Sequence, residues 1–204
     1  MKIQHIFLPS VYTNCYILGD ETTGVGAVID PGAYTDKILT TAKEMGVSLD
    51  YILLTHGHFD HVSGVAELRK HIPDAKVYLH PADAHQNTDL IPTAACGDTI
   101  PWQDGDVVKV GSLDVEVIGT PGHTPGGVVL KCESVLFTGD TLFAGSVGRT
   151  DFPGGSYDDI MKSVARLAKL PGDYQVLPGH NSFSTLETER KQNYYMVEAM
   201  ERGL

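Results

Sequence analysis

Hydrophobic and polar positions alternate in short runs over the first thirty residues, and this pattern predicts strands. Apolar and β-branched residues are interrupted by turn residues there. The predicted strands are residues 3–8, 14–18 and 25–29. Apolar positions at helical spacing follow, and they predict a helix that ends at Gly46.

The middle of the chain continues the alternation of strand and helix. Residues 51–54 form a short apolar run that leads directly into His56, and residues 76–79 form another. Helical spacing between these two runs predicts one helix after His61. Residues 81–105 show little periodicity and predict a short helix and a long loop, a length that is often functional.

The second half repeats the order of strands, helix and strand. Its predicted strands are residues 107–110, 113–118, 127–130, 135–137 and 174–177. Its predicted helices are residues 156–170 and a single terminal helix over 186–200. Each half carries loops rich in His or Asp after its strands. Two such halves predict an α/β fold, an αββα sandwich with helices outside two facing sheets. We expect a single domain over residues 1–204.

Composition and charge limit the classes of partner that we expect. The chain has 204 residues, 42% hydrophobic and 20% charged, with a net charge of −11. An acidic chain without a basic run argues against nucleic-acid binding. No apolar stretch approaches the roughly 20 residues that span a bilayer, and the N-terminus lacks the apolar region of a signal peptide. We expect a cytoplasmic protein with no nucleic-acid or membrane partner.

The three cysteines indicate neither a disulfide framework nor a CxxC zinc site, because they are odd in number and far apart in sequence. Cys15 and Cys132 lie in apolar runs and are expected to be buried. Cys96 lies in a polar stretch and is a candidate for exposure.

The stretch THGHFDHVSG, residues 55–64, contains four candidate metal ligands within six positions. Alternation along an extended chain places His56 and His58 on the same side. Asp60 and His61 come where the chain turns toward helix, so they can reach a second spot nearby. Imidazole and carboxylate together suit zinc, iron or manganese. Four ligands do not complete two coordination spheres, so further ligands are expected.

Three further candidates each follow an apolar strand and a glycine: His123, Asp140 and His180. The predicted ligands of the first ion are His56, His58 and His123. The predicted ligands of the second ion, with Asp140 as the bridge to the first, are Asp60, His61 and His180. Desolvating such a cluster without a metal would be costly. The remaining histidines are predicted to be ordinary surface or hydrogen-bonding residues: His5, His71, His80 and His85.

The motifs HxHxDH, GHTPG, GDTLF and PGH occur in this order between residues 14 and 180. In sequence and order they resemble the metallo-β-lactamase superfamily. The resemblance implies a metal site at one edge of two facing mixed β-sheets. A bound metal ion lowers the pKa of its water toward roughly 7. The expected chemistry is hydrolysis by a metal-bound hydroxide, which Asp60 would orient while it takes part in proton transfer.

The fold does not choose among the activities of this superfamily. The loop AGSVGRTDFPGGS resembles the loop after the bridging Asp in type II glyoxalases and in persulfide dioxygenases. The resemblance implies that Arg149 meets the glutathione part of a substrate, since guanidinium suits carboxylate recognition. An ion pair with Asp151 is the alternative for Arg149. Asp151 also stands where the glyoxalases carry a tyrosine, which leaves the natural thiol open.

The sequence therefore predicts a metal-dependent hydrolase that cleaves a small-molecule thioester such as S-D-lactoylglutathione. Its cofactors are predicted to be two divalent ions, zinc first, with iron or manganese also compatible. The alternative is a mononuclear iron persulfide dioxygenase, in which the iron ligands would be His56, His123 and Asp140. The oligomeric state is left open.

Overall fold

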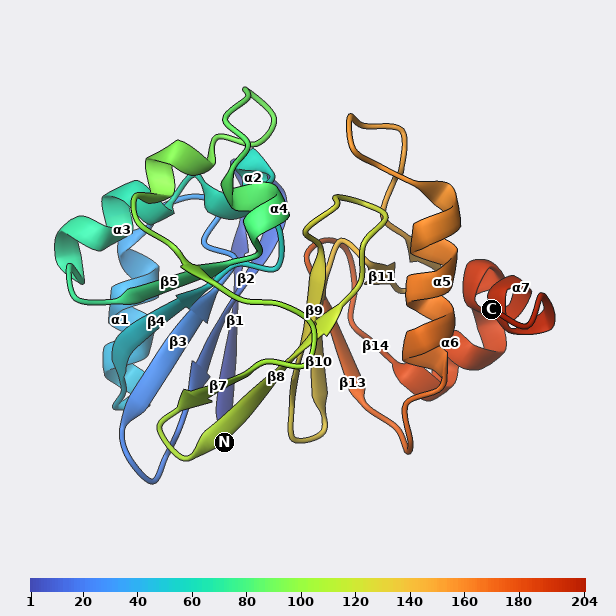
Figure 1. The fold of residues 1–204 in the computed structure, drawn as a ribbon. Helices are drawn as coiled ribbons and strands as arrows, with labels where there is room; N and C mark the ends of the chain where they lie inside the picture. The colour runs from blue at the N-terminus through green and yellow to red at the C-terminus, as the bar shows by residue number, and fades with distance from the viewer.

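Two six-stranded sheets face each other in the computed structural model, which describes residues 1–204 (Figure 1). The first sheet contains β1 (Lys2–Leu8), β2 (Thr13–Gly19), β3 (Val25–Ile29), β4 (Ser48–Leu53), β5 (Lys76–Leu79) and β6 (Ile100–Pro101), in chain order. The strands pair antiparallel from β1 to β3 and parallel from β3 to β6. The sheet is therefore mixed.

The second sheet has the order β14-β13-β10-β9-β8-β7. Its strands are β7 (Val107–Val110), β8 (Leu113–Gly119), β9 (Val128–Cys132), β10 (Val135–Gly139), β13 (Gln175–Pro178) and β14 (Ser184–Thr185). Only β10 and β13 pair in parallel, so their C-terminal ends lie at the same edge. A separate hairpin is formed by β11 (Leu142–Phe143) and β12 (Ser146–Val147).

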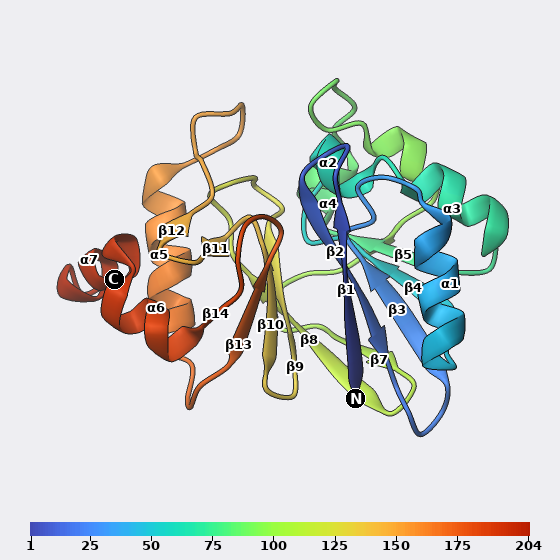
Figure 2. The same cartoon turned by 180° about the vertical axis from the view of Figure 1, so that it is seen from behind.

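Helices cover the outer face of each sheet (Figures 1 and 2). The first sheet is covered by α1 (Asp36–Met45) and α3 (Val65–His71), and the second by α5 (Tyr157–Ala168) and α6 (Leu186–Gln192). The last helix, α7 (Tyr194–Glu201), packs against α5 on the side away from the sheet. Three short helical segments lie near one end of the sandwich: α2 (Phe59–Val62), α4 (Pro81–Ala84) and a 3-10 helix (Thr93–Cys96). This arrangement confirms the predicted αββα sandwich.

Three apolar clusters correspond to the three interfaces between these layers. One lies between the sheets and includes Tyr16, Trp102 and Phe137, while the other two lie under the helices on either side. Every residue of β2 is buried, because both faces of this strand are covered. Double coverage explains why residues 15–18 of β2 form a continuous apolar run and not an alternation of apolar and polar residues.

The structure corrects three details of the sequence prediction. The single terminal helix expected over 186–200 is two helices, because Asn193 ends α6 and its side chain accepts the N–H groups of Tyr195 and Met196 at the start of α7. The helix expected after His61 also divides, into α2 and α3.

The third correction concerns the cysteines. Cys96 is buried, and burial raises the pKa of its thiol to about 11. The predicted burial of Cys15 and Cys132 is confirmed.

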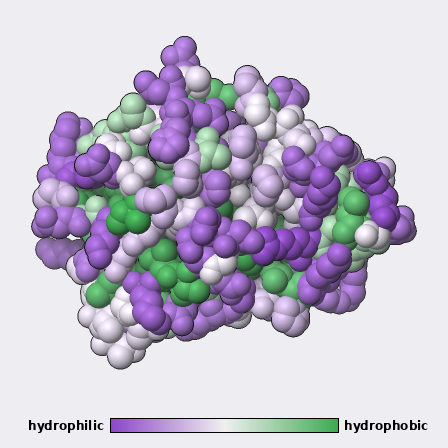
Figure 3. Space-filling view, in the orientation of Figure 1, coloured by the Kyte–Doolittle hydropathy of each residue, from purple (hydrophilic) through white to green (hydrophobic).

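The surface carries only scattered hydrophobic patches on the face drawn in Figure 3, among mostly hydrophilic residues. None of the helices has both the length and the apolar character that a membrane crossing requires.

Candidate metal centre

The seven predicted ligands come together at one edge of the sandwich, where strands end. The segment from His56 to His61 follows β4, and His123 lies in the turn between β8 and β9. Asp140 and His180 follow β10 and β13, the parallel pair of the second sheet. Parallel pairing therefore delivers these two side chains to the same place, opposite the histidines of the first sheet.

Three imidazole rings form the first set of ligand atoms. Nδ1 of His58 lies 3.1 Å from Nε2 of His56 and 2.8 Å from Nε2 of His123. All three residues are at most 5% exposed. The three nitrogen atoms lie within 4.8 Å of one another, close enough to share one ion.

The second set lies beside the first and is more open to solvent. Nε2 of His180 lies 3.2 Å from Oδ2 of Asp60 and 3.4 Å from Nε2 of His61. The side chains of Asp60 and His180 are 18% and 21% exposed, whereas His61 is fully buried.

Asp140 lies between the two sets. Its Oδ1 is 3.4 Å from Nε2 of His61, and its Oδ2 is 3.4 Å from Nε2 of His123 and 3.5 Å from Nε2 of His180. A Cβ atom on Gly179 would lie 2.5 Å from Oδ1 of Asp140 and 2.6 Å from Cε1 of His61, so this position has room for glycine alone. One carboxylate thus faces ligands of both sets, as a bridging role requires.

One unsatisfied polar atom of the cluster fits a cation. Oδ1 of Asp140 is buried without a hydrogen-bond partner, and it lies between the two ligand sets. Such an atom is uncommon in folded proteins and indicates that an ion or water binds here. Five imidazoles and two carboxylates are also a donor set that zinc, iron and manganese accept. The residues present therefore fit divalent metals.

Electrostatics prepare the first set for metal binding. Burial, together with the neighbouring His61 and His123, holds the pKa of His56 well below its ordinary value. Burial and His123 lower the pKa of His58 to about 4. Both rings are therefore neutral at neutral pH, and the neutral imidazole is the form that binds metal.

The second set behaves differently in the absence of metal. Burial disfavours the charged form of His61, but the carboxylates of Asp140 and Asp30 outweigh burial and raise its pKa well above the ordinary value. In turn, His61 and His123 hold the pKa of Asp140 far below its usual range, although burial opposes this. The two groups stabilise each other as an ion pair until a metal takes the place of the proton.

Asp30 is a functional residue that the sequence interpretation missed. It directly follows β3 and is almost fully buried. Its Oδ2 lies 3.0 Å from Nδ1 of His61, and it accepts hydrogen bonds from the backbone N–H and the hydroxyl of Thr55 at 2.8 and 2.6 Å. A carboxylate behind a ligating imidazole fixes the ring so that its other nitrogen faces the metal. The signal was present, because Asp30 also follows an apolar strand.

Backbone carbonyls orient two further rings. Nδ1 of His123 donates to the carbonyl of Arg149 at 2.7 Å, and Nδ1 of His180 donates to the carbonyl of Tyr12 at 2.8 Å. Tyr12 has a left-handed backbone with φ of 55°, a conformation that costs energy for a bulky residue. The first sheet thereby positions a ligand that belongs to the second.

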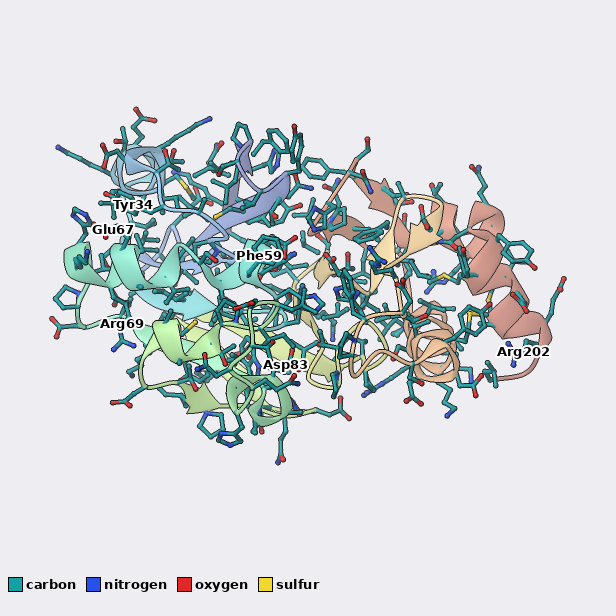
Figure 4. The ribbon with its side chains drawn as sticks, turned by 90° about the horizontal axis from the view of Figure 1, so that it is seen from above. Tyr34, Phe59, Glu67, Arg69, Asp83 and Arg202 are labelled. Atoms are coloured by element: carbon teal, nitrogen blue, oxygen red, sulfur yellow. The ribbon has the colours of Figure 1, made fainter.

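A cavity of about 650 Å³ lies over the ligands, and its walls carry several aromatic side chains. The walls include Tyr12, Phe59, Leu90, Phe143 and Phe152. Figure 4 looks onto this edge and shows Phe59 near the middle of the molecule. A hollow of about 660 Å³ beneath α1 and α3 is equally large, but no metal-ligating cluster lies in it.

Arg149 lines the cavity and is paired with Asp151. Its Nε and Nη2 atoms donate to the two carboxylate oxygens of Asp151 at 2.7 and 2.6 Å, and its guanidinium lies 4.0 Å from the ring centre of Phe152. The ion pair that was the alternative for Arg149 is therefore formed. The side chain is 57% exposed and its Nη1 makes no hydrogen bond to protein, so it can still meet a ligand.

Comparisons with known proteins agree with this architecture. Residues 8–180 match the family model described as the metallo-beta-lactamase superfamily. The chain is 31% identical to hydroxyacylglutathione hydrolase GloC of Haemophilus influenzae, with 96% of this chain and 98% of GloC covered.

Three solved structures are similar over nearly the whole chain. The BLEG-1 B3 metallo-beta-lactamase is 30% identical with a TM-score of 0.83, over 96% of this chain and 99% of its own. TTHA1623 in a di-iron-bound form is 34% identical with a TM-score of 0.82, over 94% and 99%. ETHE1 from Myxococcus xanthus is 26% identical with a TM-score of 0.83, over 100% and 92%.

These proteins share a fold and differ in what their names say they do, so the comparisons establish ancestry and not substrate. By its family match, its sandwich of two mixed sheets and its edge of histidines and aspartates, the chain belongs to the metallo-β-lactamase superfamily.

Proposed function

We propose that this protein is a metal-dependent thioester hydrolase of the glyoxalase II type, acting on a hydroxyacyl thioester such as S-D-lactoylglutathione. The observation that carries the proposal is the convergence of two ligand sets on Asp140 at the floor of one cavity. The first ion would be held by His56, His58 and His123. The second would be held by Asp60, His61 and His180.

Divalent ions in such a pair supply a water nucleophile at neutral pH and a Lewis acid for the substrate carbonyl. The protein's own residues position the ions and handle the proton. Asp140 holds the two ligand sets at a fixed separation. Asp60 has the most accessible carboxylate of the cluster, at 18% side-chain exposure, so it is placed to orient the nucleophile and to accept its proton.

The cavity suits a small thioester. Its volume of about 650 Å³ lies in the range of ordinary ligand sites. The aromatic walls would hold the acyl group out of water, and the free side of the Arg149 guanidinium would meet a carboxylate of the thiol part. The similarity to GloC, whose name states hydroxyacylglutathione hydrolysis, supports this choice of substrate.

The test is a thiol-release assay on metal-replete protein with S-D-lactoylglutathione. We expect metal-dependent turnover that is lost in His123→Ala, with elemental analysis finding two ions per chain. The expected metal is zinc, and the di-iron form of TTHA1623 makes iron the first alternative. Absence of turnover with this and other hydroxyacyl thioesters in protein that holds two ions would refute the proposal.

A mononuclear iron persulfide dioxygenase is the second candidate. The GRTDF segment and the similarity to ETHE1 favour it. Its iron would be held by His56, His123 and Asp140, a set of two histidines and one carboxylate. Oxygen consumption with glutathione persulfide, together with one iron per chain, would select this candidate over the hydrolase.

A further inference from the structure

A buried aspartate outside the seven predicted ligands connects the two loops that carry the first ligand set. Asp83 belongs to α4 and is fully buried. Its Oδ2 accepts the N–H of Gly57 at 2.9 Å and the hydroxyl of Thr124 at 2.8 Å, and its Oδ1 accepts the N–H of Gly126 at 2.9 Å. No lysine or arginine pairs with it. In Figure 4 it lies on α4, near the centre of the molecule.

The three donors belong to the two loops that carry the first ligand set. Gly57 lies between His56 and His58, and Thr124 directly follows His123. One carboxylate thus holds the loop after β4 against the turn between β8 and β9. These two segments belong to different sheets.

Asp83 packs closely against two glycines of the ligand loops. A Cβ on Gly126 would lie 2.7 Å from both Cγ and Oδ1 of Asp83, and one on Gly57 would lie 3.0 Å from its Cβ. The two glycines therefore allow the aspartate to approach both loops closely. A buried charge without a cation is costly unless hydrogen bonds satisfy it, and here all three bonds come from the ligand loops.

We propose that Asp83 is a positioning residue for the metal centre, which sets the separation of His56 and His58 from His123 and so the affinity of the first ion. This inference rests on the proposed metal centre but not on the proposed substrate. The second set is predicted to be independent of Asp83, because none of the three donors adjoins one of its ligands: Asp60 and His61 stand further along, on α2, and His180 follows β13.

Asp83→Asn tests the proposal with little change in volume. The amide can keep its oxygen toward Gly57 and Thr124, but its NH2 group then faces the N–H of Gly126, so one hydrogen bond becomes a contact between two donors. Mutation of residues that support metal ligands lowers metal affinity by about 10- to 100-fold. We expect a loss in this range for the first ion.

Two parent variants allow zinc binding to each ligand set to be measured separately. His180→Ala leaves only the first set complete, and His123→Ala leaves only the second. Zinc is titrated into metal-free protein in competition with a chromophoric chelator. Asp83→Asn should weaken zinc binding about 10- to 100-fold in the His180→Ala background and leave it unchanged in the His123→Ala background. Equal weakening in both backgrounds, or none in the first, would overturn the proposal.

Glu189→Gln is the matched control for the loss of a buried carboxylate. Glu189 is 2% exposed, has no cation partner, and accepts the N–H of Gly145 and the side chain of Asn193 at 2.8 Å, as well as the hydroxyl of Ser184. None of its donors adjoins a metal ligand. This variant should lose stability without a change in zinc affinity, and a loss of affinity equal to that of Asp83→Asn would contradict a specific role for Asp83.

A milder variant keeps the test decisive if Asp83→Asn does not fold. Thr124→Val removes one of the three donors at nearly constant volume. It should weaken zinc binding in the His180→Ala background in the same direction and by a smaller factor. Near-UV circular dichroism checks that the fold is intact. A folded Thr124→Val protein that binds zinc as tightly as its parent would overturn the proposal.

Discussion

Oδ2 of Asp30 lies 3.0 Å from Nδ1 of His61, and the two side chains are 3% and 0% exposed. This contact turns Nε2 of His61 toward Asp140 and His180, where the second ion is proposed to bind. The first sheet supplies the aspartate, so the orientation of this ligand is determined where β3 ends beside β4.

Asp30→Asn is expected to weaken the second ion selectively. The amide group places an N–H against at least one of the three donors that Asp30 now satisfies, so the free energy of unfolding should fall by about 1–3 kcal/mol. Zinc affinity at the second site should fall by about 10- to 100-fold. Titration against a chelator measures this, with exposed Asp50→Asn as the control. Unchanged binding of both ions would contradict a positioning role for Asp30.

Removal of metal should abolish activity and reduce stability together. A ligand that binds only the folded state at a free concentration of 100 times its Kd stabilises it by about 2.7 kcal/mol. Chelated protein is therefore expected to melt at a lower temperature and to show no thioesterase activity. Adding back zinc, iron or manganese in separate samples should restore both properties. The metal that gives the highest turnover rate is the preferred cofactor. Full activity after complete chelation would count against the proposed chemistry.

The metal-free protein is expected to be most stable near pH 6.5, the ordinary pKa of histidine. His56 and His58 have lowered pKa values, so the unfolded state binds more protons and stability falls as pH drops from 6.5 toward 4. For His61 and His180 the raised pKa values have the opposite effect, and stability falls as pH rises above 6.5 through those values.

Urea unfolding of chelated protein from about pH 5 to about pH 9 measures this curve. His58→Ala should lose less stability on the acid side than the parent, because one of the two responsible groups is gone. If the urea midpoint instead rises steadily from about pH 5 to about pH 9, His61 and His180 do not have the raised pKa values on which this prediction depends.

The ion pair of Arg149 and Asp151 is expected to weaken recognition of an anionic thiol. Exposed pairs contribute about 1 kcal/mol or less, so Asp151→Asn should lower KM for S-D-lactoylglutathione by up to about fivefold. Arg149→Ala should raise KM with little effect on kcat, as expected for binding that does not change during the reaction. A lactoyl thioester of N-acetylcysteamine, which has a neutral thiol, is the control substrate. Equal effects on both substrates would exclude a role in charge recognition.

Asn193→Ala is expected to destabilise the C-terminal helices and the β11–β12 hairpin together. The buried amide donates to the carbonyls of Phe143 and Ser146 at 3.3 and 3.0 Å, and its oxygen caps α7. Loss of the cap and of these bonds should lower the free energy of unfolding by about 2–4 kcal/mol. Urea unfolding measures the change, and the exposed neighbour Gln192→Ala should have little effect. A loss no larger than that of Gln192→Ala would contradict this account.

The sandwich and the candidate ligands were predictable because each depends on a local pattern. An apolar strand followed by glycine and a His or Asp marks a side chain at a strand end, as in the segments around His123 and His180. Asp30 has the first and last parts of that pattern without the glycine, which explains why it was overlooked. The cap at Asn193 was also visible, as a polar residue before the apolar run YYMV.

Other features depend on tertiary structure that no local pattern encodes. Asp83 stands in a weakly periodic segment, and its role exists only because α4 folds back between two loops that are far apart in the sequence. The burial of Cys96 depends on the same segment, whose 3-10 helix packs near α3. The polar composition of the stretch around Cys96 made that position look exposed.

Apart from Phe59, which stands among the ligands on α2, most of the cavity wall comes from other parts of the chain than the proposed ion ligands. The ligands stand at strand ends and on α2, while the walls include Leu90, the β11–β12 hairpin and the loop with Arg149 and Phe152. Leu90 and the β11–β12 hairpin lie outside the central strands, so they can be lengthened, shortened or exchanged without disturbing strand pairing. In the loop with Arg149, the backbone carbonyl that orients His123 has to be kept. New specificities can therefore arise in this lineage by grafting loops onto a retained chemical platform, and an engineer who wishes to redirect the enzyme should start with the same segments.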